Sequence, residues 1–188
     1  GKMHAFWLAA ARRLRGVPAA AAPLVVKADD DSVVNLPLLQ RTLAPLRCVP
    51  RLYYGAIAFT GYQPKGFMNC GFAWSGGGAY AKYGCARSGA HPPFPFALGQ
   101  LQVLSASLVA SLAASQEAAE LAAAAEGALA TLANEDSALG FMISMLPGAA
   151  YVGMAKRPWH NLGCIQENGM YRAPHNGSII VHRVQTAA

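Results

Sequence analysis

The feature that most constrains the fold is an apolar run, residues 24–28, that ends in three consecutive aspartates, Asp29, Asp30 and Asp31. Adjacent carboxylates repel one another and resist burial, so a core strand that ends in them needs solvent or a positive partner there. Carboxylate oxygens are the ligands that hard divalent cations prefer. If the backbone stays extended, Asp29 and Asp31 point to one side and Asp30 to the other. The alternative is a solvated acidic turn that caps the following helix.

The composition indicates one globular domain. The chain has 188 residues, of which 54% are hydrophobic and 13% charged, and this excludes a disordered chain. The net charge of +6 suits an anionic ligand such as a nucleotide diphosphate, a nucleic acid or a membrane surface. The basic residues are scattered and do not alternate with aromatic ones, so we expect no nucleic-acid partner. No segment has the length and apolar character of a membrane span.

The four cysteines give no metal signature. Cys48, Cys70, Cys85 and Cys164 include no Cys-x-x-Cys pair, so a structural zinc site is not expected. Their even number permits two disulfides in any of three pairings, without establishing an oxidising compartment.

Apolar spacing and turn residues predict alternating helices and strands. We expect helices over residues 3–14, from the Asn35 cap through 43, from Ser105 onward and over 117–132, with another after Asn134. We expect strands over residues 24–27, 52–59, 99–104, 151–154 and 178–184, and a loop that holds Trp159, His160, Cys164 and Glu167. This order predicts an α/β protein with a mixed sheet and long loops.

A long segment rich in glycine, proline and aromatic residues, 61–96, interrupts this pattern. It either forms a functional loop, in which Trp74, Tyr80, Lys82 and Tyr83 line a polar, ring-stacking site, or is an ordinary ordered loop.

Two further positions are open to a structural and a chemical interpretation. Glu135 and Asp136 precede an apolar helix, where they either cap it or supply a general base. His182 lies in the last predicted strand and is either accommodated in the fold or a ligand of the metal that the aspartates suggest.

Four blocks in this order resemble the catalytic domain of glycosyltransferase family 31, the β-1,3-galactosyltransferase and β-1,3-N-acetylglucosaminyltransferase group. The blocks are Val26-Lys27-Ala28-Asp29-Asp30-Asp31-Ser32-Val33-Val34-Asn35, Pro93-Phe94-Pro95-Phe96-Ala97-Leu98-Gly99 with Val103-Leu104-Ser105, Glu135-Asp136-Ser137-Ala138-Leu139-Gly140, and Ile179-Ile180-Val181-His182. Lys82-Tyr83 is similar to a lysine–aromatic pair of the family. Gln102 stands where the family commonly has an aromatic residue, and Ser32 where it has a large apolar one.

The resemblance implies a GT-A-like fold and an inverting, metal-dependent hexosyltransferase. Such an enzyme moves galactose or N-acetylglucosamine from a UDP-sugar to a glycan or glycoprotein hydroxyl in β-1,3 linkage. The resemblance also implies manganese and a lumenal Golgi location. The membrane would be reached only through an N-terminal type II anchor that this chain lacks. Residues 1–188 would form one catalytic domain without its N-terminal part, with an Ala-rich helical insertion at 115–133.

The resemblance also assigns roles to individual residues. Asp31, Asp29 and His182 would bind the metal, and Asp136 would be the catalytic base with Glu135 beside it. Four residues would contact the donor: Asp29, Asp30, Lys82 and Gly99. Two alternatives remain open, namely an inactive relative that binds carbohydrate or nucleotide, and a metal-dependent phosphohydrolase built on the aspartates and a histidine.

Overall fold

The computed structural model describes residues 2–17, 23–59, 62–63, 67–68, 94–124, 135–155, 159–161 and 174–182. The helices are α1 (Lys2–Arg13), α2 (Leu36–Leu43), the 3-10 helix η2 (Ala44–Leu46), α3 (Ala106–Ala114), α4 (Gln116–Ala124) and α5 (Glu135–Ser144). The strands are β1 (Leu24–Ala28), β2 (Ser32–Val34), β3 (Leu52–Phe59), β4 (Tyr62–Gln63), β5 (Phe67–Met68), β6 (Pro95–Ser105), β7 (Ala150–Gly153), β8 (Trp159–Asn161) and β9 (Ile180–His182).

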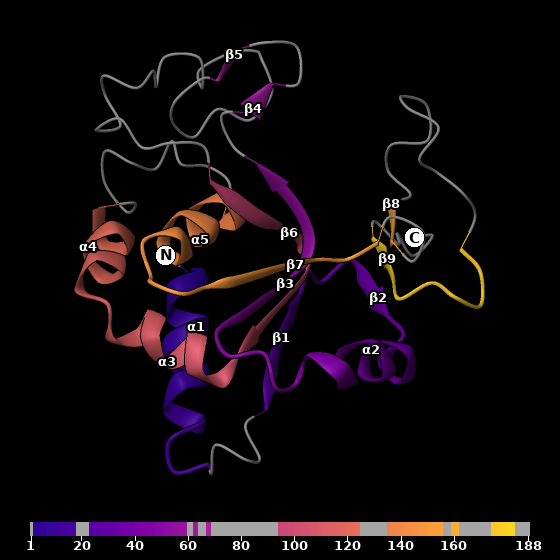
Figure 1. The fold of residues 1–188 in the computed structure, drawn as a ribbon, viewed down its shortest axis with the longest axis horizontal. Coiled ribbons are helices and arrows are strands. Elements are labelled where there is room, and N and C mark those ends of the chain that lie inside the picture. The colour runs from indigo at the N-terminus through magenta and orange to yellow at the C-terminus, as the bar shows by residue number, and fades with distance from the viewer. Residues whose placement is uncertain are drawn as a thin grey trace.

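A mixed four-stranded sheet in the order β1-β6-β3-β7 forms the centre of the described structure (Figure 1). β6 pairs antiparallel with both β1 and β3, whereas β3 pairs in parallel with β7. A smaller sheet, β2-β9-β8, lies to one side, and β4 pairs with β5. The predicted α/β class and mixed sheet are therefore confirmed.

The local signals for helix starts are confirmed by their capping bonds. The Asn35 side chain accepts a hydrogen bond from the Leu38 N–H at 3.2 Å, and Pro37 lies in the first turn of α2. Ser105 Oγ accepts from the Leu108 N–H at 3.3 Å at the start of α3. The strand predicted over residues 52–59 has those limits in β3.

Three strand predictions need correction. The strand expected over residues 99–104 is longer, Pro95–Ser105, because most of its residues are buried and no alternation marks where it begins. Trp159–Asn161, expected in a loop, forms β8, and Ser32–Val34 forms the unpredicted β2. Strands of three residues are too short to produce a readable period. Cys164 and Glu167 lie outside the described residues.

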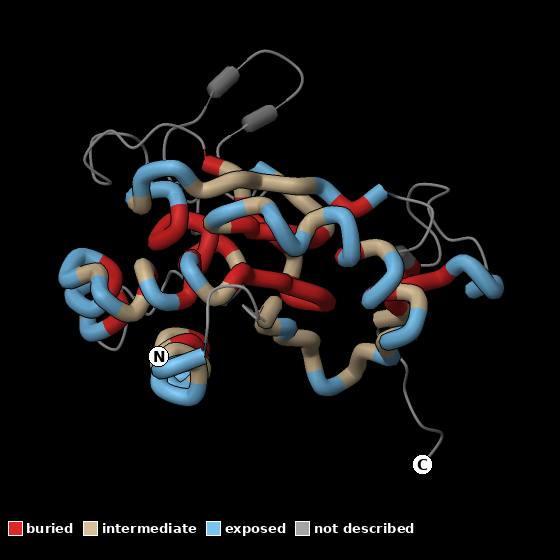
Figure 2. Tube along the Cα trace, turned by 60° about the horizontal axis from the view of Figure 1, so that its bottom comes forward, coloured by how far each residue is buried: buried red, intermediate tan, exposed pale blue. Residues whose placement is uncertain are grey.

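The central sheet separates two apolar clusters, because successive strand residues point to opposite faces. Tyr53 and Leu104 face α1, α3, α4 and α5, where they pack with Trp7 and Leu139. The opposite-face cluster contains residues of α2 and β9, joined by strand residues: Leu39, Leu43, Leu52, Tyr54, Leu101, Val103 and Ile180. Figure 2 shows the buried positions concentrated along the sheet, between exposed outer turns.

The start of the predicted Ala-rich insertion, residues 115–133, is part of this packing. Ala118 and Ala122 on α4 are buried in the cluster that contains Trp7. Residues 125–134 lie outside the described part of the chain, so the insertion itself stays a prediction. None of the described helices is long and apolar enough to cross a membrane.

Helix α5 packs against the backbone of β6 at Gly140. A Cβ added to Gly140 would lie 2.3 Å from the Phe96 Cβ and 2.8 Å from the Pro95 carbonyl oxygen. Neither neighbour is the flexible end of a side chain, so a larger residue would push the helix away. Gly140 lies one helical turn after Asp136 and therefore shares its face. The close approach that glycine permits brings Asp136 to the sheet.

A shift in register distorts β6 opposite β3. Gly55 pairs with Gln102 and Ile57 pairs with Ala97, so β6 uses five steps where β3 uses two. We call residues 98–101 the β6 bulge. Such bulges interrupt the ladder and redirect backbone and side-chain groups. Here the bulge brings Gly99 to the end of β1, where the aspartates follow.

Gly140→Ala is expected to destabilise the protein by about 1–3 kcal/mol, even though alanine favours helices over glycine by about 1 kcal/mol. The reason is overlap of the new methyl group with the β6 backbone. Urea unfolding measures the change. Gly153→Ala on β7 is the matched control, because its Cβ would come no closer than 3.9 Å to Ile57. Equal stability of the two variants would contradict close packing at Gly140.

Candidate metal and acid–base site

Two aspartates and a histidine converge where β1 ends and β2 begins. The chain turns between these strands, and the Ser32 N–H donates to the Asp29 carbonyl at 3.1 Å. β2 then pairs antiparallel with β9, with Ser32 opposite His182. This register brings His182 beside Asp31, so the convergence depends on a turn and a strand pairing. The sequence-based expectation brought Asp29 and Asp31 together through an extended backbone, whereas in the structure a turn and a strand pairing do so.

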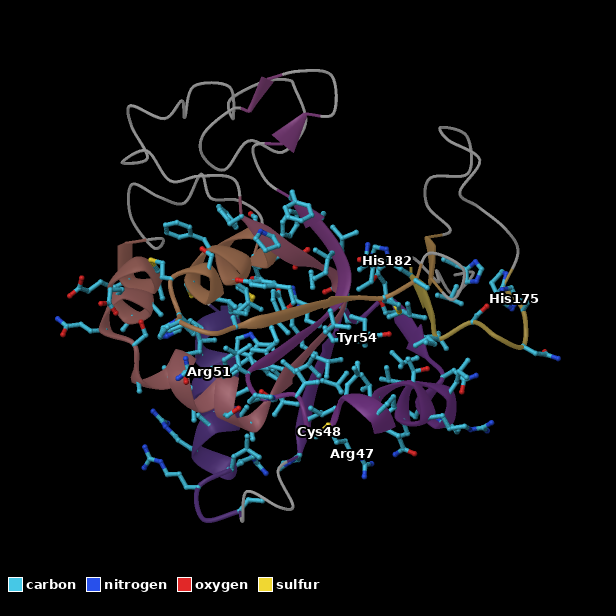
Figure 3. All side chains as sticks on the ribbon, viewed as in Figure 1. Arg47, Cys48, Arg51, Tyr54, His175 and His182 are labelled. Carbon is cyan, nitrogen blue, oxygen red and sulfur yellow. The ribbon has the colours of Figure 1, made fainter. Side chains whose placement is uncertain are left out.

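The ligand atoms of this group lie close together. His182 Nε2 is 3.1 Å from Asp31 Oδ1 and 3.8 Å from Asp29 Oδ2, and the three residues offer atoms within 4.8 Å of one another. The His182 side chain is 12% exposed, whereas those of Asp29 and Asp31 are 33% and 43% exposed. In Figure 3, His182, the last residue of β9, lies on the side toward the central sheet, whereas His175 lies on the outer side. Solvent can therefore reach the carboxylate side of the group.

A lysine on β1 partly balances the negative charge. Lys27 Nζ lies 3.0 Å from Asp29 Oδ1 in a half-buried ion pair. Lys27 was not among the predicted site residues, because a single lysine in an apolar strand has no distinguishing pattern. The alternation of apolar and polar residues along the strand would be the same if Lys27 faced solvent. The structure brings it to the aspartates.

Asp136 reaches the same region from the other side of Gly99. The Gly99 N–H donates to Asp136 Oδ2 at 2.7 Å, and Gln102 Nε2 lies 3.4 Å from Asp136 Oδ1. A Cβ on Gly99 would lie 2.6 and 2.8 Å from the two Asp136 oxygens and 2.8 Å from Asp29 Oδ2. Gly99 therefore separates the base candidate from the metal-binding candidates and leaves no room there for a side chain.

Burial raises the pKa of Asp136 from 3.8 to about 6. The charges of Asp29 and Glu135 raise this pKa further, while the Gly99 hydrogen bond and the charge of Lys27 lower it. A carboxylate with this pKa is mostly ionised at neutral pH and is a stronger base than an exposed aspartate. The Asp136 carboxylate bonds to β6 across the site, where a group with this pKa could accept a proton at neutral pH.

The remaining predicted residues lie apart from this group or outside the described structure. Asp30 is exposed in the turn, and it does not belong to the Asp29–Asp31–His182 group. Glu135 is exposed at the start of α5, where it acts on Asp136 through its charge. Lys82 lies outside the described residues. The donor-binding roles of Asp30 and Lys82 stay predictions.

The donor set fits a divalent cation. Two carboxylates and one imidazole combine oxygen and nitrogen ligands, a set suited to manganese among other divalent metals. The ligand set does not select manganese over other such ions. The cysteines contribute nothing to this set among the described residues, where Cys48 is exposed and free.

Comparison of the chain with protein-family models and with curated proteins gives no match.

Gly99→Ala is expected to weaken manganese binding about 10–100-fold, because the methyl group would displace Asp29 and Asp136. The carboxylates are the ends of flexible side chains, so unfolding free energy should change by only about 1 kcal/mol. Calorimetric titration with manganese chloride, beside urea unfolding, measures both quantities. Gly153→Ala is again the control. Unchanged manganese affinity would contradict the site.

The raised pKa of Asp136 also predicts a pH dependence of stability. Between about pH 4 and pH 6 the folded state binds more protons than the unfolded state, so the free energy of unfolding falls as the pH rises. A rise of the pKa from 3.8 to about 6 corresponds to about 3 kcal/mol, most of which is lost by about pH 6. Asp136→Asn removes this contribution, so its stability relative to the parent should increase from pH 4 to pH 7.

Urea unfolding in metal-free buffer at several pH values measures this difference. Glu120→Gln, which removes an exposed carboxylate on α4, controls for the loss of one negative charge. A constant difference between Asp136→Asn and the parent across the range would show that burial does not raise the Asp136 pKa.

Proposed function

We propose that the chain is an inverting hexosyltransferase with a GT-A-like fold, and that it uses a divalent cation and a UDP-sugar donor. The transferred sugar is galactose or N-acetylglucosamine, and the acceptor is a glycan or glycoprotein hydroxyl that becomes β-1,3-linked. The observation that carries this proposal is the arrangement around Gly99. A group that could hold a metal ion lies on one side, and a separate, partly buried carboxylate lies on the other.

Two carboxylate groups with different environments suit this reaction. Asp29 and Asp31 are partly exposed, with Lys27 Nζ 3.0 Å from Asp29 Oδ1 and His182 Nε2 3.1 Å from Asp31 Oδ1. Asp136 is more buried and has a pKa of about 6. The first group can hold positive charge near a diphosphate, while Asp136 accepts a proton.

In the proposed step, an acceptor hydroxyl oxygen forms a bond to the sugar C1 as the bond from C1 to the diphosphate oxygen breaks. Asp136 accepts the hydroxyl proton, and UDP leaves with the electron pair. Attack opposite the leaving group inverts the configuration at C1. The Gly99 N–H fixes one oxygen of Asp136, so the carboxylate is oriented before substrate binds.

A divalent cation bound by Asp29, Asp31 and His182 would act as a Lewis acid that neutralises the charge of the departing diphosphate. Lys27 adds a second positive charge on the same side, and its pairing with Asp29 keeps it there. Glu135, exposed next to Asp136, supports the high proton affinity of the base through its negative charge. The same proposal assigns the enzyme to the Golgi lumen, where glycan acceptors of this class are extended.

Asp136→Asn should lower the transfer rate at least about 100-fold while manganese-dependent UDP binding is kept, because the variant loses the base and keeps the metal ligands. Asp31→Asn should instead weaken manganese and UDP binding together. Calorimetry with UDP and manganese chloride, together with a UDP-release assay on UDP-galactose and UDP-N-acetylglucosamine, measures both effects in the full chain.

Three outcomes separate the alternatives. A parent chain that binds neither manganese nor UDP and releases no UDP would contradict the enzyme proposal. Binding without turnover would favour the inactive, ligand-binding relative. Loss of UDP binding in Asp136→Asn would assign Asp136 a structural role.

A further inference from the structure

A fully buried glutamine, Gln102, lies between the β6 bulge and α5. Gln102 follows Leu101 and precedes Val103, both of which face α2, so its side chain faces α5 on the other side of the sheet. Its Nε2 donates to the Ala97 carbonyl at 2.9 Å and lies 3.4 Å from Asp136 Oδ1. One amide group therefore contacts both Ala97, the residue before the β6 bulge, and the base candidate Asp136.

The orientation of this amide is fixed by chemistry. A carbonyl oxygen only accepts hydrogen bonds, so the NH2 side of Gln102 must face Ala97. The two N–H groups on the same nitrogen then serve Ala97 and Asp136, and Gln102 presents only a donor to the carboxylate. A donor that faces a carboxylate favours its ionised form, which is the form that a general base needs.

The other end of the amide costs stability. Gln102 Oε1 is buried and has no hydrogen-bond partner among the described residues. A buried acceptor without a partner is unfavourable, and an apolar side chain of similar size would avoid that penalty. A role in packing alone does not explain a glutamine here, whereas a donor aimed at Asp136 does.

We propose that Gln102 is a positioning residue for Asp136, and that its amide fixes the carboxylate oxygen that Gly99 does not hold. This inference rests on the function proposed above, in which Asp136 is the base. Gly99 donates to Oδ2 and Gln102 donates toward Oδ1, so the carboxylate is held from β6 at both oxygens. Rotation of the carboxylate away from the acceptor hydroxyl is thereby restricted.

Groups from several elements act on the same carboxylate. Lys27 from β1 favours its ionised form, whereas Asp29 after β1 and Glu135 on α5 disfavour it. Tyr53 from β3 is neutral at physiological pH, because burial raises its pKa far above the usual value, and its hydroxyl accepts from the Ala97 N–H at 2.9 Å. Tyr53 thus holds Ala97, the residue before the β6 bulge, as Gln102 does, but no hydrogen bond from Tyr53 to Asp136 is present among the described residues.

That difference provides a matched pair of variants. Gln102→Met removes the donor to Asp136 and the bond to Ala97, whereas Tyr53→Phe removes only a bond to Ala97. We expect Gln102→Met to raise the Asp136 pKa by about half a unit to one unit, and Tyr53→Phe to leave it in place. The titration is followed by carbon-13 NMR of aspartate-labelled full-length chain in metal-free buffer, with Asp136→Asn to assign the signal.

The kinetic arm uses the same variants. Gln102→Met should move the acidic limb of the pH–rate profile upward by the same amount and lower kcat about tenfold, with UDP and manganese affinity kept. Tyr53→Phe should lower stability without moving the limb. In the parent chain, the Gln102 amide proton signals should titrate with Asp136 and stop titrating in Asp136→Asn, a readout that needs no variant at Gln102.

The result that would overturn the role is an Asp136 titration unchanged in Gln102→Met, or one shifted equally in Tyr53→Phe, together with Gln102 amide signals that do not follow Asp136. A parent chain without transferase activity would instead contradict the proposed function, and the NMR titrations would still decide whether Gln102 positions Asp136.

Discussion

The site depends on the irregular pairing of β6 with β3. Between Gly55 and Ile57 the register shifts, and Gly99 is released from the regular ladder. A backbone N–H that leaves a ladder needs another acceptor, and the Gly99 N–H finds it in Asp136. Ala97, the residue before the bulge, is held at both of its backbone polar groups, since Tyr53 accepts from the N–H and Gln102 donates to the carbonyl. The distortion of the sheet therefore directs the Gly99 N–H toward Asp136 as a hydrogen-bond donor.

Packing of α5 completes this arrangement. Asp136 can bond to Gly99 only if its helix lies against the β6 backbone, and Gly140 allows that approach because it has no side chain. The Glu-Asp-x-x-x-Gly spacing therefore has a physical meaning, since the carboxylate and the contact glycine share one helix face, one turn apart. Two glycines on different elements set the position of one carboxylate.

The sequence predicted the residues of the site better than it predicted their geometry. Asp29, Asp31, Asp136 and Gly99 carry recognisable chemistry or spacing, and the structure brings them together with His182. The turn after Asp29 and the pairing of β2 with β9 were not predictable, because three-residue strands have no readable period.

Lys27 and Gln102 were missed for a different reason. Lys27 pairs with Asp29, two residues further along, only because of the path that the backbone takes there. Gln102 contacts Asp136, which is distant in sequence, and the β6 bulge makes this contact possible. In a single sequence a lysine in an apolar strand and a glutamine between apolar residues look like ordinary exposed positions. The fold class was easier to predict, because interleaved helices and strands leave strong local signals such as the Asn35 and Ser105 caps.

Proximity across Gly99 links the two carboxylate groups energetically. The charge of Asp29 raises the pKa of Asp136, so neutralisation of Asp29 must lower it. Lys27 already pairs with Asp29 and lowers the Asp136 pKa, and any further cation held beside Asp29 would act in the same direction. By linkage, ionised Asp136 strengthens the attraction of the site for cations by an equal free energy. A cation on one side of Gly99 thus favours the ionised form of Asp136 on the other side. Because this coupling weakens with distance, two carboxylate groups separated only by Gly99 suit it better than two distant sites would.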